Sequence, residues 1–189
     1  MRAGCALFGA ALFGALVARA DAQGMSIHMH SGEGYAADGV LFEPTAGQAP
    51  FAAIVVIPDE RGVIKQITDS AQDLAAAGYF VVVVDLNRGE APGVAKLSDG
   101  QAMHDLNAAL AFLSKQSRVR RDCFGALGWD SGGKYARRLA AVANSKVCAV
   151  AIREGSDLKV YPDAGRASDT GDVQQRTQRF FKAQLGSRR

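Results

Sequence analysis

The sequence predicts an α/β fold, a three-layer sandwich with helices on both sides of a mostly parallel sheet. Two observations predict it. Short, uninterrupted apolar runs rich in β-branched residues recur along the chain, and such runs are typical of strands that are buried on both faces of a parallel sheet. Between these runs lie stretches with apolar residues at helical spacing, and alternation of strand and helix builds right-handed parallel units.

The first 22 residues are predicted to be a secretory signal peptide. Arg2 supplies a positive start, residues 6–17 are apolar, and residues 20–22 (Ala-Asp-Ala) form a small–x–small cleavage site. The apolar stretch is too short to cross about 30 Å of hydrocarbon comfortably. We therefore expect a single mature domain, residues 23–189, that is secreted or periplasmic and has no membrane partner after cleavage.

The first half of this domain contains four predicted strands. Residues 25–30 alternate apolar and polar side chains, as in a half-buried edge strand, and residues 39–42 form a second strand. Residues 52–57 and 79–85 are apolar runs predicted as buried strands. The helix between them ends at Gly78, which is a suitable C-cap. Its apolar stripe consists of Ile64, Ile67, Ala71, Leu74 and Ala75.

The second half repeats the alternation. Ser98 is a suitable N-cap for a helix, and residues 123–127 form the third buried strand, with a further helix ending near residue 142. Residues 147–152 and 158–161 are the last two strands. Because five residues are too few for a helical crossover, we expect these two strands to be antiparallel neighbours, or the last to be displaced. The apolar stripe of the helix that Ser98 caps consists of Met103, Leu106, Leu110 and Leu113. A closing helix is predicted from a second stripe, which consists of Val173, Thr177, Phe180, Phe181 and Leu185.

Composition and charge exclude several classes of function. The chain is 48% hydrophobic and 22% charged, and its net charge of +3 is spread over the sequence, apart from a short Arg-rich stretch at 118–121 and the tail. A nucleic-acid binder would concentrate its positive charge, so no nucleic-acid partner is expected. Scattered histidines and two mature cysteines do not give the four ligands of a zinc site. We expect no metal and no cofactor, and the oligomeric state stays open.

Cys123 and Cys148 each stand in a predicted strand. If the two strands are neighbours, the Cα atoms could lie within the roughly 4.4–6.8 Å that a disulfide needs, and export would permit the bond. The interpretation that the sequence favours is two small, buried apolar side chains.

The strongest signal for chemistry is the segment at residues 128–133 (Gly-Trp-Asp-Ser-Gly-Gly). A strand end, a glycine-bounded turn and a helix start form a nucleophile elbow, which holds its central residue in a strained conformation above the sheet. We predict that Asp130 lies there, directly after the third buried strand, with Ser131 opening the helix. The N–H groups of Ser131 and Glu60 could then stabilise an oxyanion. The predicted substrate pocket also includes Asp59, Arg61 and Trp129.

Several segments, in order, resemble one known family. They are residues 55–62 (VVIPDERG), 74–79 (LAAAGY), 84–86 (VDL), 105–113 (DLNAALAFL), 128–133 (GWDSGG), 160–165 (VYPDAG) and 178–181 (QRFF). This pattern is similar to the dienelactone hydrolase family of the α/β-hydrolase superfamily. The resemblance implies an α/β-hydrolase-like sandwich, reduced at its C-terminal part, that hydrolyses small esters or lactones.

The chain departs from that family at all three triad positions. The family has Cys or Ser at the elbow, where this chain has Asp130, and a catalytic histidine where this chain has Arg166. The strand that ends in the family's catalytic aspartate is missing between residues 152 and 158. The family's acid after the first buried strand corresponds to Asp59. The resemblance therefore implies a hydrolase with weak or lost activity.

Several interpretations of the elbow stay open. Asp130 could itself be the nucleophile, but it would need a histidine to activate water, and the chain has only His28, His30 and His104. Ser131 could attack, although no histidine-containing partner motif is present. Asp130 and Arg166 could form an ion pair, which is the most economical interpretation. The alternative to an enzyme is a non-catalytic pseudohydrolase that binds a small anionic or aromatic ligand. A third hypothesis is a truncated protein without a selected function.

Overall fold

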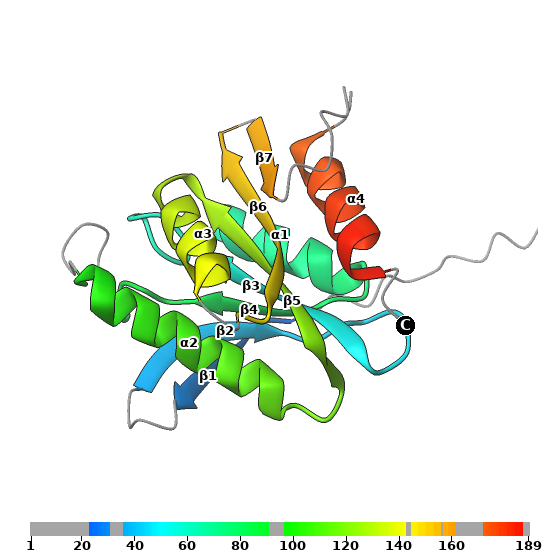
Figure 1. The fold of residues 1–189 in the computed structure, drawn as a ribbon, viewed down its shortest axis with the longest axis horizontal. Helices are drawn as coiled ribbons and strands as arrows, with labels where there is room; N and C mark the ends of the chain where they lie inside the picture. Colours follow the sequence, from blue (N-terminus) through cyan, green and yellow to red (C-terminus); the bar gives the residue numbers. More distant parts are fainter. Residues whose placement is uncertain are drawn as a thin grey trace, which may run out of the picture.

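The predicted α/β sandwich is confirmed. The computed structural model describes residues 23–30, 36–90, 97–142, 145–155, 157–161 and 172–186. Within them lies a seven-stranded sheet with the order β1-β2-β4-β3-β5-β6-β7, with helices on both faces (Figure 1). The predicted signal peptide lies outside the described residues. None of the described helices has both the length and the apolar composition needed to span a membrane.

The elements follow the predicted order. The strands are β1 (Met25–His30), β2 (Ala36–Phe42), β3 (Phe51–Ile57), β4 (Phe80–Val84), β5 (Val119–Trp129), β6 (Val147–Glu154) and β7 (Asp157–Tyr161). The helices are α1 (Lys65–Ala76), α2 (Asp99–Lys115), the 3-10 turn η1 (Asp130–Gly132), α3 (Gly133–Ala141) and α4 (Val173–Gly186). β2 and β5 begin earlier than the sequence predicts, at Ala36 and Val119.

The four central strands of the sheet are parallel and the outer ones are antiparallel. β4, β3, β5 and β6 pair in parallel, whereas β1 pairs antiparallel with β2, and β2 with β4. β7 pairs antiparallel with β6, with Glu154 opposite Asp157. This confirms that the last two strands are antiparallel neighbours joined by a tight turn.

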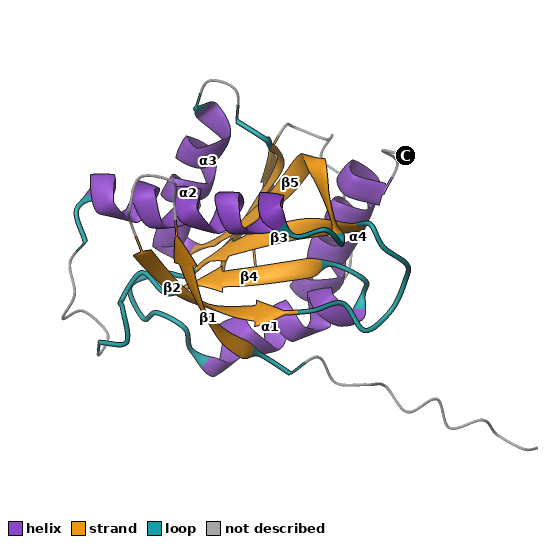
Figure 2. Cartoon of the chain, turned by 90° about the horizontal axis from the view of Figure 1, so that it is seen from below, coloured by secondary structure: helices purple, strands orange, loops and turns teal. Residues whose placement is uncertain are grey.

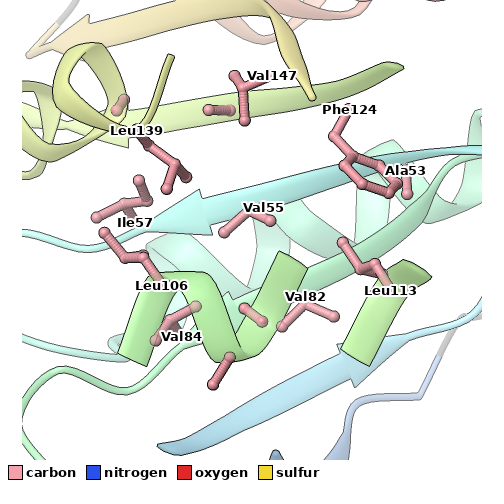
Figure 3. Packing of buried hydrophobic residues seen from close by; sticks show 14 of the residues in the cluster. Ala53, Val55, Ile57, Val82, Val84, Leu106, Leu113, Phe124, Leu139 and Val147 are labelled. Atoms are coloured by element: carbon pink, nitrogen blue, oxygen red, sulfur yellow. The ribbon is translucent and has the colours of Figure 1, made fainter. Parts of the chain in front are cut away.

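The core has two halves, one on each face of the sheet. In β3, Val55 and Ile57 face α2 and α3, while Ile54 and Val56 face α1 and α4, as the period of two in a strand requires. Figure 2 shows α2 and α3 on one side of the sheet and α1 on the other. Figure 3 shows side chains of α2 and α3 gathered over the first of these faces. The uninterrupted apolar run of β3 is thus buried from both sides.

Local signals set the helix boundaries. Ser98 caps α2 as predicted, because its Oγ accepts from the N–H of Gln101 at 3.2 Å while the Gln101 side chain accepts from the N–H of Ser98 at 3.0 Å. α1 is followed by Gly78, whose φ of +97° suits glycine. All five residues of the stripe predicted for the closing helix are buried in α4.

A disulfide joins Cys123 of β5 to Cys148 of β6, with the Cα atoms 5.6 Å apart. The interpretation that the sequence favoured, two small buried apolar residues, is therefore wrong. The register explains the pairing. Phe124 lies opposite Val147 and Gly125 lies opposite Ala149, so Cys148 is an extra residue in β6 at this point.

Candidate active site

The nucleophile elbow forms where the sequence predicts it. β5 ends at Trp129, and Asp130 begins η1, which leads directly into α3. Asp130 has a φ of +42°, in the left-handed region that non-glycine residues seldom adopt. Strained backbone of this kind is often held at functional sites. The predicted placement of Asp130, with Ser131 and Gly132 opening a helix, is confirmed.

Close packing holds the elbow against the end of β3. A Cβ atom on Gly132 would overlap the carbonyl oxygens of Ile57 and Pro58. Both obstacles are backbone atoms, which cannot rotate away. The absence of a side chain at Gly132 therefore lets the start of the helix approach the turn that follows β3, and this approach brings the side chains of the two segments together.

Asp59 and Arg61 lie in the turn after β3 and form a tight pair. The buried carboxylate of Asp59 accepts hydrogen bonds from the N–H of Arg61 at 2.9 Å and from its Nε at 2.8 Å. Burial raises the pKa of Asp59, but the hydrogen bonds from Arg61 outweigh burial and the net pKa lies below its ordinary value. The same hydrogen bonds raise the pKa of Arg61. Both groups are therefore charged at neutral pH.

Arg61 also contacts the elbow residue. Its Nη2 lies 3.3 Å from Oδ2 of Asp130, while Oδ1 of Asp130 accepts from the N–H of Gly155 at 3.2 Å. The carboxylate is thus fixed between the turn after β3 and the turn that joins β6 to β7. Arg166, the partner suggested by the sequence, lies outside the described residues. The structure supplies Arg61 as an arginine partner that the sequence analysis did not assign to Asp130.

Ser131 contacts a different acid. Its Oγ donates to Oε2 of Glu60 at 2.6 Å. This hydrogen bond holds the pKa of Glu60 below its ordinary value. The carbonyl oxygen of Glu60 in turn accepts from Nδ2 of Asn87 at 3.2 Å, which fixes the backbone of the turn. The sequence analysis assigned backbone N–H groups to Glu60 and Ser131, whereas the structure also joins their side chains.

A cavity of about 290 Å³ opens beside the elbow. Its lining is Asp130, Ser131, Gly133, Lys134, Arg137, Ile152, Glu154 and Lys159. Nζ of Lys134 lies 3.2 Å from Oδ1 of Asp99, and Nζ of Lys159 lies 2.6 Å from Oε2 of Glu154. For Arg137 the described residues show no ion-pair partner. The cavity therefore combines an acid and a hydroxyl at the elbow with three cationic side chains.

Four charged lining residues were missed by sequence reasoning. Lys134 and Arg137 follow Asp130 by four and seven residues, a helical spacing that places them on the elbow's side of α3. That spacing was an available signal. Glu154 reaches the cavity from the end of β6 and Lys159 from the middle of β7, which the antiparallel turn brings there.

Trp129 does not line this cavity. It is buried, and the guanidinium of Arg153 lies 4.2 Å from the centre of its ring. Within the described residues its Nε1 has no hydrogen-bond partner. The ring belongs to the half of the core that faces α1 and α4. A ligand in the cavity would therefore not meet the indole ring.

The histidines lie on other parts of the fold. His28 and His30 are on β1, where His28 is paired with Asp38 of β2. Four strand spacings of about 4.8 Å, roughly 19 Å, separate β1 from β5. His104 lies on α2 and interacts electrostatically with Asp105. None of the three lines the described cavity, and no group of three metal-ligating side chains occurs among the described residues.

Comparisons with known proteins identify relatives. The model of the "Dienelactone hydrolase family" matches residues 37–170. A "Probable 2-oxo-3-(5-oxofuran-2-ylidene)propanoate lactonase" from Bradyrhizobium sp. is 33% identical over 95 residues, which cover 44% of this chain and 38% of that protein. The chain spans less than two fifths of the length of the curated relatives it matches.

Solved structures show the same fold. The "Dienelactone Hydrolase-like Promiscuous Phospotriesterase P91 from Metagenomic Libraries" is 19% identical with a TM-score of 0.57, covering 72% of this chain and 59% of its own. The α/β hydrolase GrgF from Penicillium sp. sh18 is 17% identical with a TM-score of 0.58, covering 69% of this chain and 45% of its own. The architecture is that of a reduced α/β hydrolase.

Proposed function

Because the chain belongs to the dienelactone hydrolase family, we propose that it binds small esters or lactones in the cavity beside Asp130 and hydrolyses activated ones slowly, without the family's relay. The observation that carries the proposal is the fixed carboxylate of Asp130. It is held by Arg61 and by the N–H of Gly155, and no histidine lines the described cavity. A carboxylate held in this way has no neighbouring histidine to activate water against an ester intermediate.

The lining of the cavity favours a substrate that carries a negative charge. Lys134, Arg137 and Lys159 lie around it, and a carboxylate accepts hydrogen bonds from such groups. The lactone named for the relative from Bradyrhizobium sp. is a propanoate, which fits this charge pattern. The second candidate function, binding without turnover, is favoured by the same fixed carboxylate.

Asp130→Ala tests the role of the elbow residue. We expect hydrolysis of 4-nitrophenyl acetate by this variant to equal or slightly exceed that of the unaltered chain, because the carboxylate of Asp130 repels a developing oxyanion. Steady-state rates are compared with those of Asp122→Ala, which alters an exposed aspartate at the other end of β5. A loss of about 10²-fold or more in Asp130→Ala alone would reject the proposal and favour Asp130 as the nucleophile.

The double variant Asp130→Cys/Arg166→His restores the family's residues at two positions. A gain of activity in this variant supports the view that the missing relay limits the rate. If the unaltered chain hydrolyses no ester above the buffer rate but still binds a small carboxylate in the cavity, binding without turnover is the better description.

We also propose that residues 1–22 direct export and are removed. The apolar stretch and the cleavage site support this, and so does the disulfide, because such bonds persist in oxidising compartments. After expression of the full chain with an intact export system, the mass of the periplasmic or secreted protein should correspond to a start at Gln23. Recovery of the uncleaved chain from the cytoplasm alone would contradict export.

A further inference from the structure

We propose that Ser131 is the nucleophile of the slow ester hydrolysis and that Glu60 is the base that takes its proton. The proposal rests on the proposed hydrolytic function and names the residues that carry it. Its central observation is the 2.6 Å hydrogen bond from Oγ of Ser131 to Oε2 of Glu60. This distance lies within the range expected for a nucleophile and its base.

The pair is held in place from both sides. Glu60 stands between Asp59 and Arg61, which are joined to each other by side-chain and backbone hydrogen bonds. The amide of Asn87, a buried residue, donates to the carbonyl oxygen of Glu60. Ser131 is fixed by the close approach of η1 to the end of β3 at Gly132. Two hydrogen-bonded and closely packed turns thus present the two side chains to each other before any substrate binds.

The hydroxyl is also accessible to a substrate. Ser131 is exposed, lines the cavity and lies in η1, directly before α3. Lys134 and Arg137 line the same cavity, so their positive charges can stabilise a carbonyl oxygen that becomes negative during attack. Asp130, by contrast, has both carboxylate oxygens occupied by Arg61 and Gly155. Of the two polar elbow side chains, Ser131 is the one whose partner is a base.

The chemistry balances with water as the only other reactant. Oγ of Ser131 forms a bond to the acyl carbon while its proton passes to Glu60, and the bond to the phenolate leaving group breaks. Glu60 then passes this proton to the phenolate or the solvent. Water attacks the acyl carbon and gives a proton to Glu60. The bond between the acyl carbon and Oγ breaks, the acid is released, and Oγ takes that proton from Glu60.

Acid pH distinguishes this pair from a histidine-based relay. The hydrogen bond from Ser131 holds the pKa of Glu60 below its ordinary value, so the carboxylate stays ionised as the pH falls to about 5.5. A histidine with an ordinary pKa of about 6.5 would be mostly protonated there. The rate of ester hydrolysis should therefore stay nearly constant between about pH 8 and pH 5.5. It should fall only when the pH drops below the ordinary pKa of a glutamate, about 4.3.

The experiment combines covalent labelling with hydrolysis by the full chain. Diisopropyl fluorophosphate forms a phosphorus–oxygen bond to an active serine and releases fluoride, and mass spectrometry locates the modified peptide. In the unaltered chain we expect labelling at Ser131. In Ser131→Ala we expect no labelling and hydrolysis of 4-nitrophenyl acetate at the buffer rate. In Glu60→Gln the rates of labelling and of hydrolysis should each fall by about 10²-fold or more. Glutamine keeps the hydrogen-bond acceptor but is not a base. Ser117→Ala and Glu43→Gln, which alter exposed residues away from the elbow, serve as controls.

The outcomes separate the two proposals. Undiminished hydrolysis in Ser131→Ala would overturn the assignment of the nucleophile while leaving slow hydrolysis intact. Labelling of Glu60→Gln at the rate of the unaltered chain would overturn the role of Glu60. Labelling at Ser131 that depends on Glu60, in a chain that hydrolyses no ester, would support the pair and refute the proposed hydrolysis.

Discussion

Truncation of Phe181 to alanine is expected to lower the free energy of unfolding by about 3–5 kcal/mol. The ring is fully buried and makes edge-to-face contacts with the rings of Phe180 and Tyr79. The distances between ring centres are 5.2 Å and 6.4 Å, respectively. It also fills the space over Gly125 of β5, where an added Cβ would overlap the ring. Loss of the ring should leave a cavity between α4 and the sheet, because the surrounding structure relaxes only partly into such a space.

Urea denaturation followed by circular dichroism measures this effect. Lys182→Ala is the matched control, since it removes an exposed side chain from the next position of the same helix and should change stability by less than about 0.5 kcal/mol. Phe181→Leu should fall between the two, because it keeps part of the buried volume. A loss below about 1 kcal/mol in Phe181→Ala would mean that α4 does not depend on this contact.

Removal of the disulfide between Cys123 and Cys148 is expected to cost about 3.5 kcal/mol. The bond closes a loop with a sequence separation of 25 residues, and the chain-entropy model gives a value of this size for such a loop. The double variant Cys123→Ala/Cys148→Ala should therefore unfold at a lower urea concentration than the oxidised chain.

Dithiothreitol supplies the control for this measurement. It should lower the stability of the unaltered chain by a similar amount and leave that of the double variant unchanged. Equal unfolding midpoints for the oxidised and reduced unaltered chain would show that the bond does not contribute to stability.

Elements with a local signal could be predicted from the sequence. The closing helix is one case, since the spacing of Val173, Thr177, Phe180, Phe181 and Leu185 alone defines the buried face of α4. The elbow is another, because the order of strand, glycine-bounded turn and helix start is written in consecutive residues. The start of β5 was missed because it contains Arg120, Arg121 and Asp122, which are not typical of a buried strand.

The sequence predicted that the turn after the first buried strand meets the elbow, but not which side chains pair there. Arg61 and Asp130 are 69 residues apart, and Glu60 and Ser131 are 71 residues apart, so neither pair leaves a periodic pattern. The disulfide depends on the irregular register that inserts Cys148 into β6. Trp129 was predicted to line the pocket, but its ring lies in the half of the core that faces α1 and α4, and no pattern in the sequence distinguishes these two positions.

Folding kinetics follow from the parallel pairing of β3 with β5. The polypeptide between them must close into a long loop before this pairing forms, and such closure is slow because its entropic cost precedes the gain in contacts. The turn after β3 and the elbow after β5 meet only when these strands align. Arg61 should therefore reach Asp130, and Glu60 should reach Ser131, late in folding, after the helices have formed. Separation of β3 from β5 would break both contacts together, so loss of the site should coincide with cooperative unfolding of the sheet.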